Sequence, residues 1–259
     1  MKLKGKVAIV TGGAKGMGKE FSLAFAREGA DVVVCARNIS ELEKVTSEIK
    51  GMGQKSIALL MDVTSESSVE GAVRRAVGEF GRIDILANTA GVIGPIETMG
   101  TNVSVADFES VWRTNTLGTF ITNRAVLKVM IPQKEGRIVN IAGTSGLRGY
   151  RMRVAYSSSK WAVIGITKTL ALEVGRYNIR VNAICPGATM GDRMSTIVHE
   201  KARVRGVPVE EVEKEYAEDM ALKRWLKPTE QAAAAIFLAS DDSSAITGQA
   251  IAADGGWDV

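Results

Sequence analysis

The stretch VAIVTGGAKGMG, residues 7–18, joins an apolar run to a turn that contains four glycines. The β-branched run at 7–10 predicts a strand, and the segment 17–28 has the period of a helix that ends at Gly29. A strand, a glycine-rich turn and a helix in this order are typical of the first unit of a parallel α/β sheet. We therefore expect the same alternation along the rest of the chain.

The alternation continues to the end of the chain. Further strands are expected at 32–36, 56–61, 83–87, 137–141, 179–184 and 249–252. Further helices are expected at 39–50, 107–130 and 154–177. Another helix is expected to begin behind a cap at Thr64/Ser65, and a last one, capped by Pro228-Thr229, reaches Ala239. Apolar strands that alternate with helices indicate a parallel sheet covered on both faces. The sequence therefore predicts one doubly wound α/β Rossmann domain over residues 1–259, with a seven-stranded parallel sheet. The charged segment 189–227 is expected to form a helical substrate lid.

The composition, with 46% hydrophobic and 24% charged residues, is that of an ordinary globular protein. The formal net charge of +4 contains no block of lysine and arginine, so we expect no nucleic-acid partner. The N-terminal apolar run is too short for a signal segment and no later run reaches membrane length, so we expect a cytoplasmic protein without a membrane partner. Cys35 and Cys185 are expected to be reduced core residues, and the sole histidine, His199, gives no support for a metal site.

The glycine turn also predicts a nucleotide site. Ligands of parallel sheets bind at the carboxyl ends of strands, where the following helix presents free N–H groups to a pyrophosphate. Gly12, Gly16 and Gly18 form the pattern G-x-x-x-G-x-G, which lets the backbone approach a phosphate closely. Residues 13–19 also fit the G-x-x-x-x-G-K pattern of a nucleoside-triphosphate loop, but Glu20 stands where that loop needs Ser or Thr. We therefore expect a dinucleotide.

The end of the second predicted strand reads Cys35-Ala36-Arg37 and indicates which dinucleotide is bound. Enzymes that prefer NAD usually place an acidic residue here to accept the ribose hydroxyls. No carboxylate is present, whereas Arg37 and Lys15 can both reach a 2′-phosphate. We expect NADP(H) in preference to NAD(H); the alternative is that Arg37 is a solvated charge ahead of the next helix.

The segment 138–160 carries Tyr156 and Lys160, four residues apart on a predicted helix. That spacing places both side chains on one face, where an ammonium favours the phenolate and lowers the pKa of the tyrosine. Such a tyrosine exchanges protons with an alcohol or a carbonyl. The pair alone occurs by chance on many helices, so its interpretation depends on the nucleotide site.

Several ordered motifs together resemble the short-chain dehydrogenase/reductase family, over essentially the whole chain. The matches are T-G-x-x-x-G-x-G at 11–18, Asp62 followed by Val63, Asn88-Thr89-Ala90-Gly91 for the family's N-N-A-G, Asn115, Tyr156 and Lys160 for Y-x-x-x-K, and Pro186-Gly187. The resemblance implies hydride transfer between a nicotinamide and the carbon of a small-molecule carbonyl compound or alcohol. It implies that Tyr156 is the general acid or base, that Lys160 lowers its pKa and holds the nicotinamide ribose, and that Asn115 fixes a water in the proton relay.

The residues expected to bind the cofactor come from the turn, the strand ends and the catalytic helix. They are Gly12, Lys15, Gly16, Met17, Gly18, Arg37, Asp62, Val63, Asn88, Ala90, Gly91, Tyr156, Lys160, Pro186, Gly187 and Thr189. The resemblance further implies a homotetramer, assembled through the tail at 252–259 and the helix that bears the tyrosine.

One position departs from the family pattern. The serine that normally lies thirteen residues before the tyrosine is replaced by Gly143, and Thr144 and Ser145 follow it. Three explanations stay open: a hydroxyl of Thr144 or Ser145 takes over, other donors orient the substrate, or the protein is a catalytically impaired nucleotide-binding sensor or scaffold. We favour the first, with Ser145 as the candidate catalytic hydroxyl, because a glycine allows a small shift of the loop.

The loop that precedes the catalytic helix contains three arginines in six residues: Arg148, Arg151 and Arg153. Guanidinium groups bind a carboxylate, sulfonate or phosphate in a bidentate manner, so the loop indicates an anionic or polar substrate. The alternative is a solvated loop or a salt network at a subunit interface. Three arginines of the lid fit either interpretation: Arg193, Arg203 and Arg205.

Overall fold

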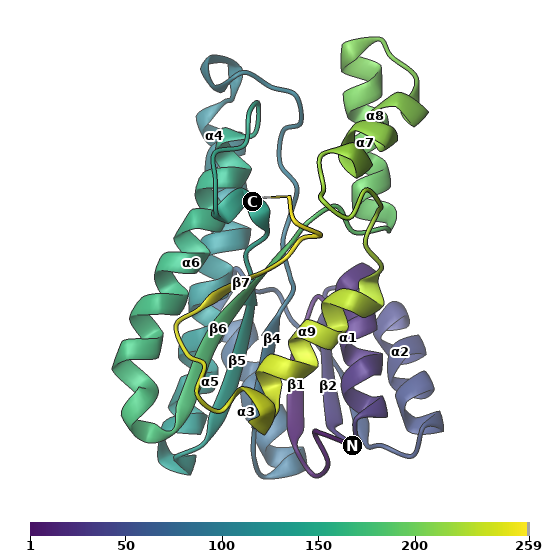
Figure 1. Ribbon diagram of the computed structural model, residues 1–259. Coiled ribbons are helices and arrows are strands. Elements are labelled where there is room, and N and C mark those ends of the chain that lie inside the picture. Colours follow the sequence, from purple (N-terminus) through teal and green to yellow (C-terminus); the bar gives the residue numbers. More distant parts are fainter. Residues whose placement is uncertain (258–259) are drawn as a thin grey trace.

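The computed structural model describes residues 1–257; residues 258–259, the end of the predicted tail, lie outside the described part. Within it, seven parallel strands form one sheet in the order β3-β2-β1-β4-β5-β6-β7 (Figure 1). The strands are β1 (Val7–Thr11), β2 (Asp31–Ala36), β3 (Ser56–Leu60), β4 (Ile85–Asn88), β5 (Gly136–Ile141), β6 (Ile179–Pro186) and β7 (Ala250–Ala253). The seven-stranded, doubly wound parallel sheet predicted from the sequence is confirmed.

Helices cover both faces of this sheet. One face packs against α1 (Gly16–Arg27), α2 (Ile39–Gly51) and α9 (Pro228–Ala239). The other packs against α3 (Glu66–Phe80), α5 (Gly118–Gln133) and α6 (Val154–Val174). The two buried layers explain why the strands are apolar on both sides.

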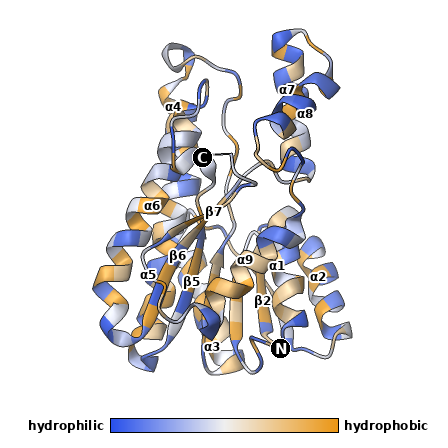
Figure 2. Ribbon diagram, in the orientation of Figure 1, coloured by the Kyte–Doolittle hydropathy of each residue, from blue (hydrophilic) through white to orange (hydrophobic). Residues whose placement is uncertain are grey.

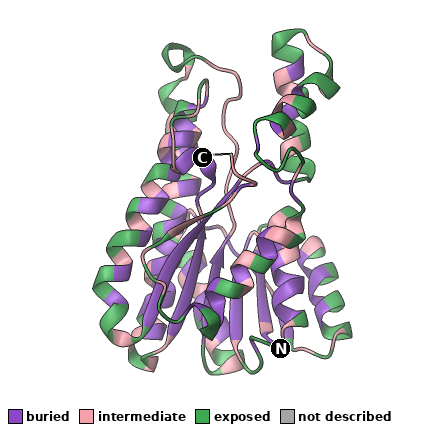
Figure 3. Cartoon of the chain, viewed as in Figure 1, coloured by how far each residue is buried: buried purple, intermediate pink, exposed green. Residues whose placement is uncertain are grey.

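The side chains of β1 alternate between the two layers, as those of an extended strand do. Ala8 and Val10 belong to the layer with α1 and α9, whereas Val7 and Ile9 belong to the layer with α3 and α5. Every residue of β1 and β6 is buried (Figure 3), and the apolar colouring is concentrated in the strands (Figure 2). Burial of this apolar surface is the main driving force for the fold.

The helix expected at 107–130 is interrupted. Its first part, α4 (Val105–Trp112), is followed by a π-helical turn at Arg113–Leu117, and only then does α5 begin. π-helical turns are rare and occur frequently at functional sites. Here the turn carries Asn115, which is fully buried. The prediction of one continuous helix was therefore wrong at the position that the family resemblance had marked.

Helix ends also differ from the expectation. The α-helix expected at 154–177 ends at Val174, and a 3-10 turn, Gly175–Tyr177, completes it. The last helix is not capped by Pro228-Thr229: Lys227 is its N-cap residue, and the Glu230 side chain accepts a hydrogen bond from the Lys227 N–H at 2.7 Å. Pro228 is instead the first helical residue, where its missing N–H costs nothing.

Residues 189–227, the lid segment, contain α7 (Asp192–Arg205) and α8 (Val209–Glu218). They share a small apolar core that includes Ile197, Val212 and Tyr216. Figure 1 shows both helices beyond the carboxyl ends of the strands, apart from the helices on the sheet faces. The role of a lid stays a prediction. Across residues 1–257, no helix combines the length and apolar character needed to cross a bilayer.

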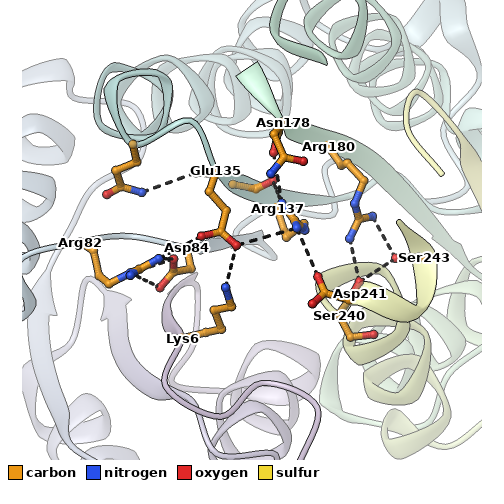
Figure 4. A network of polar contacts seen from close by, with 12 residues as sticks. Lys6, Arg82, Asp84, Glu135, Arg137, Asn178, Arg180, Ser240, Asp241 and Ser243 are labelled. Atoms are coloured by element: carbon orange, nitrogen blue, oxygen red, sulfur yellow. Dashed lines mark hydrogen bonds and ion pairs between the residues drawn. The ribbon is translucent and has the colours of Figure 1, made fainter. Parts of the chain in front are cut away.

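Buried arginines tie together the amino-terminal edge of the sheet (Figure 4). Arg137 of β5 and Arg180 of β6 are register partners, and both are buried. Arg137 donates to the Asp241 carboxylate at 3.3 Å, and Arg180 donates to the Ser240 carbonyl at 2.7 Å. Both contacts hold the segment that follows α9. Because ligands of such sheets bind at the carboxyl edge, this network has a structural role.

Candidate active site

A cavity of about 790 Å³ lies along the carboxyl ends of the strands. Its walls come from the β1–α1 turn, the strand ends, the start of α6 and the lid segment. This volume is within the range of ligand-binding sites. Every catalytic or cofactor-binding residue predicted from the sequence lines the cavity except Asn88 and Asn115. The fold therefore brings together residues that are far apart in the sequence.

Asn88 is buried behind the cavity. Its Nδ2 donates to Asn140 Oδ1 at 2.9 Å, and its Oδ1 accepts from the Thr122 hydroxyl at 2.7 Å. These bonds occupy the side chain and fix the end of β4, from which the cavity residues Ala90 and Gly91 continue. We infer that Asn88 supports the site, and its direct contact with a cofactor stays a prediction.

The glycine turn fits a pyrophosphate. Gly12 and Gly16 have positive φ angles of 65° and 51°, which L side chains rarely adopt. A Cβ atom on Gly18 would lie 2.2 Å from the Gly12 carbonyl oxygen, so only glycine allows α1 to start this close to the turn. Lys15, the N-cap residue, provides no side-chain cap for α1. The first N–H groups of the helix therefore remain available to an anion.

Lys15 and Arg37 line one end of the cavity, and both are exposed. Lys15 Nζ forms an ion pair with Glu41 at 2.6 Å. The pKa of Asp62 is lowered mainly by hydrogen bonds from the N–H and hydroxyl of Thr64, at 2.9 and 2.8 Å, and further by the charge of Arg37. Lys15 and Arg37 thus both line the cavity, as expected, and Lys15 already has the Glu41 carboxylate as its partner.

Main-chain contacts hold Lys160 and Asn115. Lys160 is only 4% exposed, and its Nζ donates to the Ile141 carbonyl at 2.8 Å. Asn115 Oδ1 accepts from the Val92 N–H at 2.8 Å, and its Nδ2 donates to the Ser159 hydroxyl at 3.1 Å. Asn115 therefore links the loop after β4 to α6, the helix that carries Tyr156 and Lys160.

Three cations surround Tyr156. Lys160 Nζ lies 5.7 Å and Arg153 Cζ lies 4.8 Å from the centroid of its ring. Burial raises the pKa of Tyr156, but the charges of Lys160, Arg193 and Arg153 outweigh burial and bring the pKa below its ordinary value of 10.0. Burial is also the main cause that lowers the pKa of Lys160. The phenol is therefore biased toward the form that accepts a proton.

Gly143 has a φ angle of 94°, so its backbone conformation favours glycine. A Cβ atom built on it would lie 3.7 Å from Ser145 Oγ and 3.9 Å from the Tyr156 hydroxyl oxygen. A serine at this position would thus place its hydroxyl beside Tyr156. Thr144 and Ser145 are buried in the following 3-10 turn, and both line the cavity.

A family model described as short chain dehydrogenase matches residues 6–202. The chain belongs to the short-chain dehydrogenase family. A relative, the 3-oxoacyl-(acyl-carrier-protein) reductase FabG of Thermotoga maritima, is 36% identical over 256 residues, which cover 99% of each chain.

Solved structures of the short-chain dehydrogenase family are also similar to this chain. An NAD⁺-bound xylitol dehydrogenase has a TM-score of 0.95 and 35% identity, and the match covers 99% of this chain and 100% of that one. A variant of actinorhodin polyketide ketoreductase with NADPH has a TM-score of 0.92 and 33% identity, over 97% of each chain. The match over nearly the whole chain agrees with the motifs read from the sequence.

In this short-chain dehydrogenase, the three arginines of the loop before α6 have different environments. Arg151 is exposed and does not line the cavity. The Arg148 guanidinium lies 5.2 Å from the centroid of the Trp257 ring. Arg153 is only 3% exposed and lines the cavity. A solvated charge therefore describes Arg151, whereas Arg153 belongs to the site.

The arginines of the lid segment also differ in whether they line the cavity. Arg203 pairs with Glu200 at 2.7 Å and Arg205 with Glu215 at 2.6 Å, and neither arginine lines the cavity. Arg193 does line the cavity, and one of its Nη atoms donates to the Gly91 carbonyl.

Sequence reasoning missed an aromatic wall of the cavity, formed by Tyr150, Tyr216 and Trp257. The hydroxyls of Tyr150 and Tyr216 lie 3.0 Å apart, and the Trp257 ring contacts both rings edge-on. The three residues come from the loop before α6, from α8 and from the tail. They are far apart in the sequence. The only signal for a shared site was that each is an aromatic residue within a polar segment.

Proposed function

We propose that this protein is an NADP(H)-dependent oxidoreductase that interconverts a carbonyl compound and a secondary alcohol. The observation that carries the proposal is Tyr156, with a lowered pKa, in the same cavity as the glycine turn. The nicotinamide supplies or accepts a hydride when it is bound. The protein then has to donate a proton in reduction and accept one in oxidation, and Tyr156 is suited to both steps.

Each neighbour of Tyr156 has a proposed task. Ser145 donates a hydrogen bond to the carbonyl oxygen of the substrate, in place of the serine that Gly143 replaces. Lys160 stabilises the phenolate and holds the nicotinamide ribose. Asn115 keeps the loop at Val92 against α6 and positions a water of the proton relay.

The preference for NADP(H) over NAD(H) is supported by Arg37 and Lys15, which lie at one end of the cavity beyond β2. A 2′-phosphate at this place would be hydrogen-bonded by a guanidinium and would compete with Glu41 for the ammonium. Among the similar structures, one is bound to NAD⁺ and one contains NADPH. The proposal therefore depends on the two cations of this chain.

We propose that the substrate carries an anionic or polar substituent. Support comes from Arg153 and Arg193, which line the cavity and act on the pKa of Tyr156. Such charges are compatible with a polar ligand and disfavour a purely apolar one, because desolvating a cation against an apolar group costs free energy.

We further propose that the protein is a homotetramer and is located in the cytoplasm. Large apolar side chains are exposed on the outer surfaces of α5 and α6, among them Phe120, Trp161 and Leu172, the last of which is 87% exposed. Exposed apolar groups on neighbouring helices favour association. Light scattering coupled to size exclusion measures the assembly, and cell fractionation measures the compartment.

The central experiment follows the absorbance of NADPH with a panel of oxo compounds, and of NADP⁺ with the corresponding alcohols. Turnover by the native protein and its loss in Tyr156→Phe support the mechanism, whereas an active Tyr156→Phe variant excludes it. Nucleotide binding is measured separately, by fluorescence of the bound NADPH. Binding without turnover across the whole panel would favour the impaired sensor or scaffold suggested by Gly143.

A further inference from the structure

Arg153 is the residue that immediately precedes α6, and its guanidinium lies over the ring of Tyr156. One Nη atom donates to the Ile93 carbonyl at 2.9 Å, and the guanidinium lies 4.8 Å from the centroid of the Tyr156 ring. The residue is 3% exposed, and what is exposed of it faces the cavity. A full positive charge is therefore enclosed at the substrate side of the site.

This charge has no counterion in the part of the chain that the structure describes. No carboxylate of residues 1–257 lies within ion-pair distance of Arg153, and its Nε is buried without a hydrogen-bond partner. Lys201, which lies near the rings of Tyr150 and Tyr216, does have such a partner, since it pairs with Glu97 at 3.2 Å. A buried cation without a carboxylate partner is costly, so Arg153 is poised for an anion from outside the chain.

Tyr150 and Tyr216, the two tyrosines of the aromatic wall, do not supply that anion. Burial is the main cause that raises the pKa of both Tyr150 and Tyr216, so both are neutral phenols at physiological pH. Together with Trp257 they form an uncharged wall that lowers the local dielectric and strengthens any charge pair formed there.

We propose that Arg153 binds the carboxylate of the substrate, which makes the substrate a short oxo or hydroxy acid. This inference rests on the proposed oxidoreductase function, because Tyr156 defines where the reacting oxygen lies. The guanidinium lies 4.8 Å from the ring centroid of the same tyrosine whose hydroxyl contacts that oxygen. Carboxylate and reacting carbon are therefore separated by only a few bonds. The planar fork of a guanidinium matches the two oxygens of a carboxylate.

The test uses keto acids in which the distance between the carbonyl and the carboxylate grows by one methylene at a time: pyruvate, acetoacetate and levulinate, each against its methyl ester. The ratio of kcat/KM for acid and ester is measured with NADPH for the native protein and for Arg153→Met. We expect one acid to be preferred, and Arg153→Met to lower the acid-to-ester ratio by about 10- to 100-fold, the effect of a hydrogen-bonded charge pair. An unchanged ratio overturns the inference and leaves the oxidoreductase function intact.

Two variants serve as controls. Arg151→Met removes a charge from the same loop at an exposed position and should leave the ratio unchanged. Arg153→Lys keeps the charge but loses the planar fork, so it should lower the ratio only in part; it also covers the case that Arg153→Met does not fold. If Arg151→Met lowers the ratio as much as Arg153→Met, the effect is general electrostatics and the inference is wrong.

A binding measurement separates this inference from the proposed function. The melting temperature is recorded with NADP⁺ present, with and without each keto acid. We expect the preferred acid to stabilise the native protein and not Arg153→Met, since a ligand that binds only the folded state raises its stability. This holds whether or not turnover is seen. Stabilisation without turnover retains Arg153 as a carboxylate site and counts against the oxidoreductase function; no stabilisation by any acid overturns the inference.

Discussion

The Ser145 hydroxyl oxygen lies 3.7 Å from the point where a Cβ atom on Gly143 would stand. The same point lies 3.9 Å from the Tyr156 hydroxyl. Gly143, with its φ of 94°, ends the extended part of the chain and leads into the turn that carries Ser145. The departure of this chain from the family pattern is therefore confined to one turn. The serine hydroxyl is missing at Gly143, but the Ser145 hydroxyl lies on the same turn.

Ser145→Ala should lower kcat for carbonyl reduction by about 10²–10³-fold, because the hydrogen bond to the developing oxyanion is lost. Thr144→Val, which removes the neighbouring hydroxyl of the same turn, should have a small effect. Steady-state kinetics with NADPH and an active oxo compound measure both. If Thr144→Val shows the large loss instead, the roles of the two residues are exchanged.

Gly143→Ser should not create a better enzyme, although it restores the family residue. The φ of 94° is strained for any L side chain, and we expect a loss of about 1–3 kcal/mol in the free energy of unfolding. Urea denaturation measures this loss. Gly149→Ser, at an exposed glycine whose φ is not in the positive range, is the matched control. A Gly143→Ser protein of native stability and higher activity would contradict this account of the turn.

The rate of alcohol oxidation should rise with pH and level off below pH 10, because oxidation needs the phenolate and the pKa of Tyr156 lies below 10.0. Arg193→Met removes a positive charge near the phenol. Loss of that charge raises the pKa, so the midpoint of the pH–kcat/KM profile should move to higher pH. Arg203→Met, whose arginine pairs with Glu200 on the lid segment, should leave the midpoint in place. A shift to lower pH in Arg193→Met would show that the charge does not act as described.

Arg37→Ala should weaken NADPH binding by about 10- to 100-fold and leave NADH binding nearly unchanged, because only the 2′-phosphate loses a charged hydrogen bond. Fluorescence titration with both dinucleotides measures the two affinities. Glu41→Gln releases Lys15 from its ion pair and should strengthen NADPH binding. Equal weakening of both dinucleotides by Arg37→Ala would argue against a 2′-phosphate at this place.

Asp84→Ala should lower the free energy of unfolding by about 2–4 kcal/mol, because it removes a buried carboxylate with two fixed partners. Asp84 accepts a hydrogen bond from the Val7 N–H at 2.8 Å and pairs with Arg82 (Figure 4). Asp242→Ala breaks an ion pair with Lys2 in which both partners are half exposed, and it should cause no measurable loss. Urea unfolding compares the two variants, and a similar loss in both would contradict the role given to burial.

Much of the fold could be predicted because local patterns carry it. The apolar runs marked all seven strands of the described chain, and Gly29 marked a helix end, since it adopts a positive φ angle. The interruption at Arg113–Leu117 could not be predicted. A π-helical turn leaves no period in the sequence, and the buried hydrogen bonds of Asn115 to Val92 and Ser159 stabilise it.

The same division holds for the site. The ordered motifs that include Gly12, Gly18, Tyr156 and Lys160 indicated the family and the type of reaction to propose, because each motif lies within one turn or one helix. Only the tertiary structure decided which arginine of the loop is buried, and how near the Ser145 hydroxyl lies to the place of the missing serine. Burial, charge compensation and distance depend on segments that are remote in the chain, so the sequence carries no local signal for them. Arg151 and Arg153 look alike in the sequence, yet one is exposed and the other lies over the ring of Tyr156.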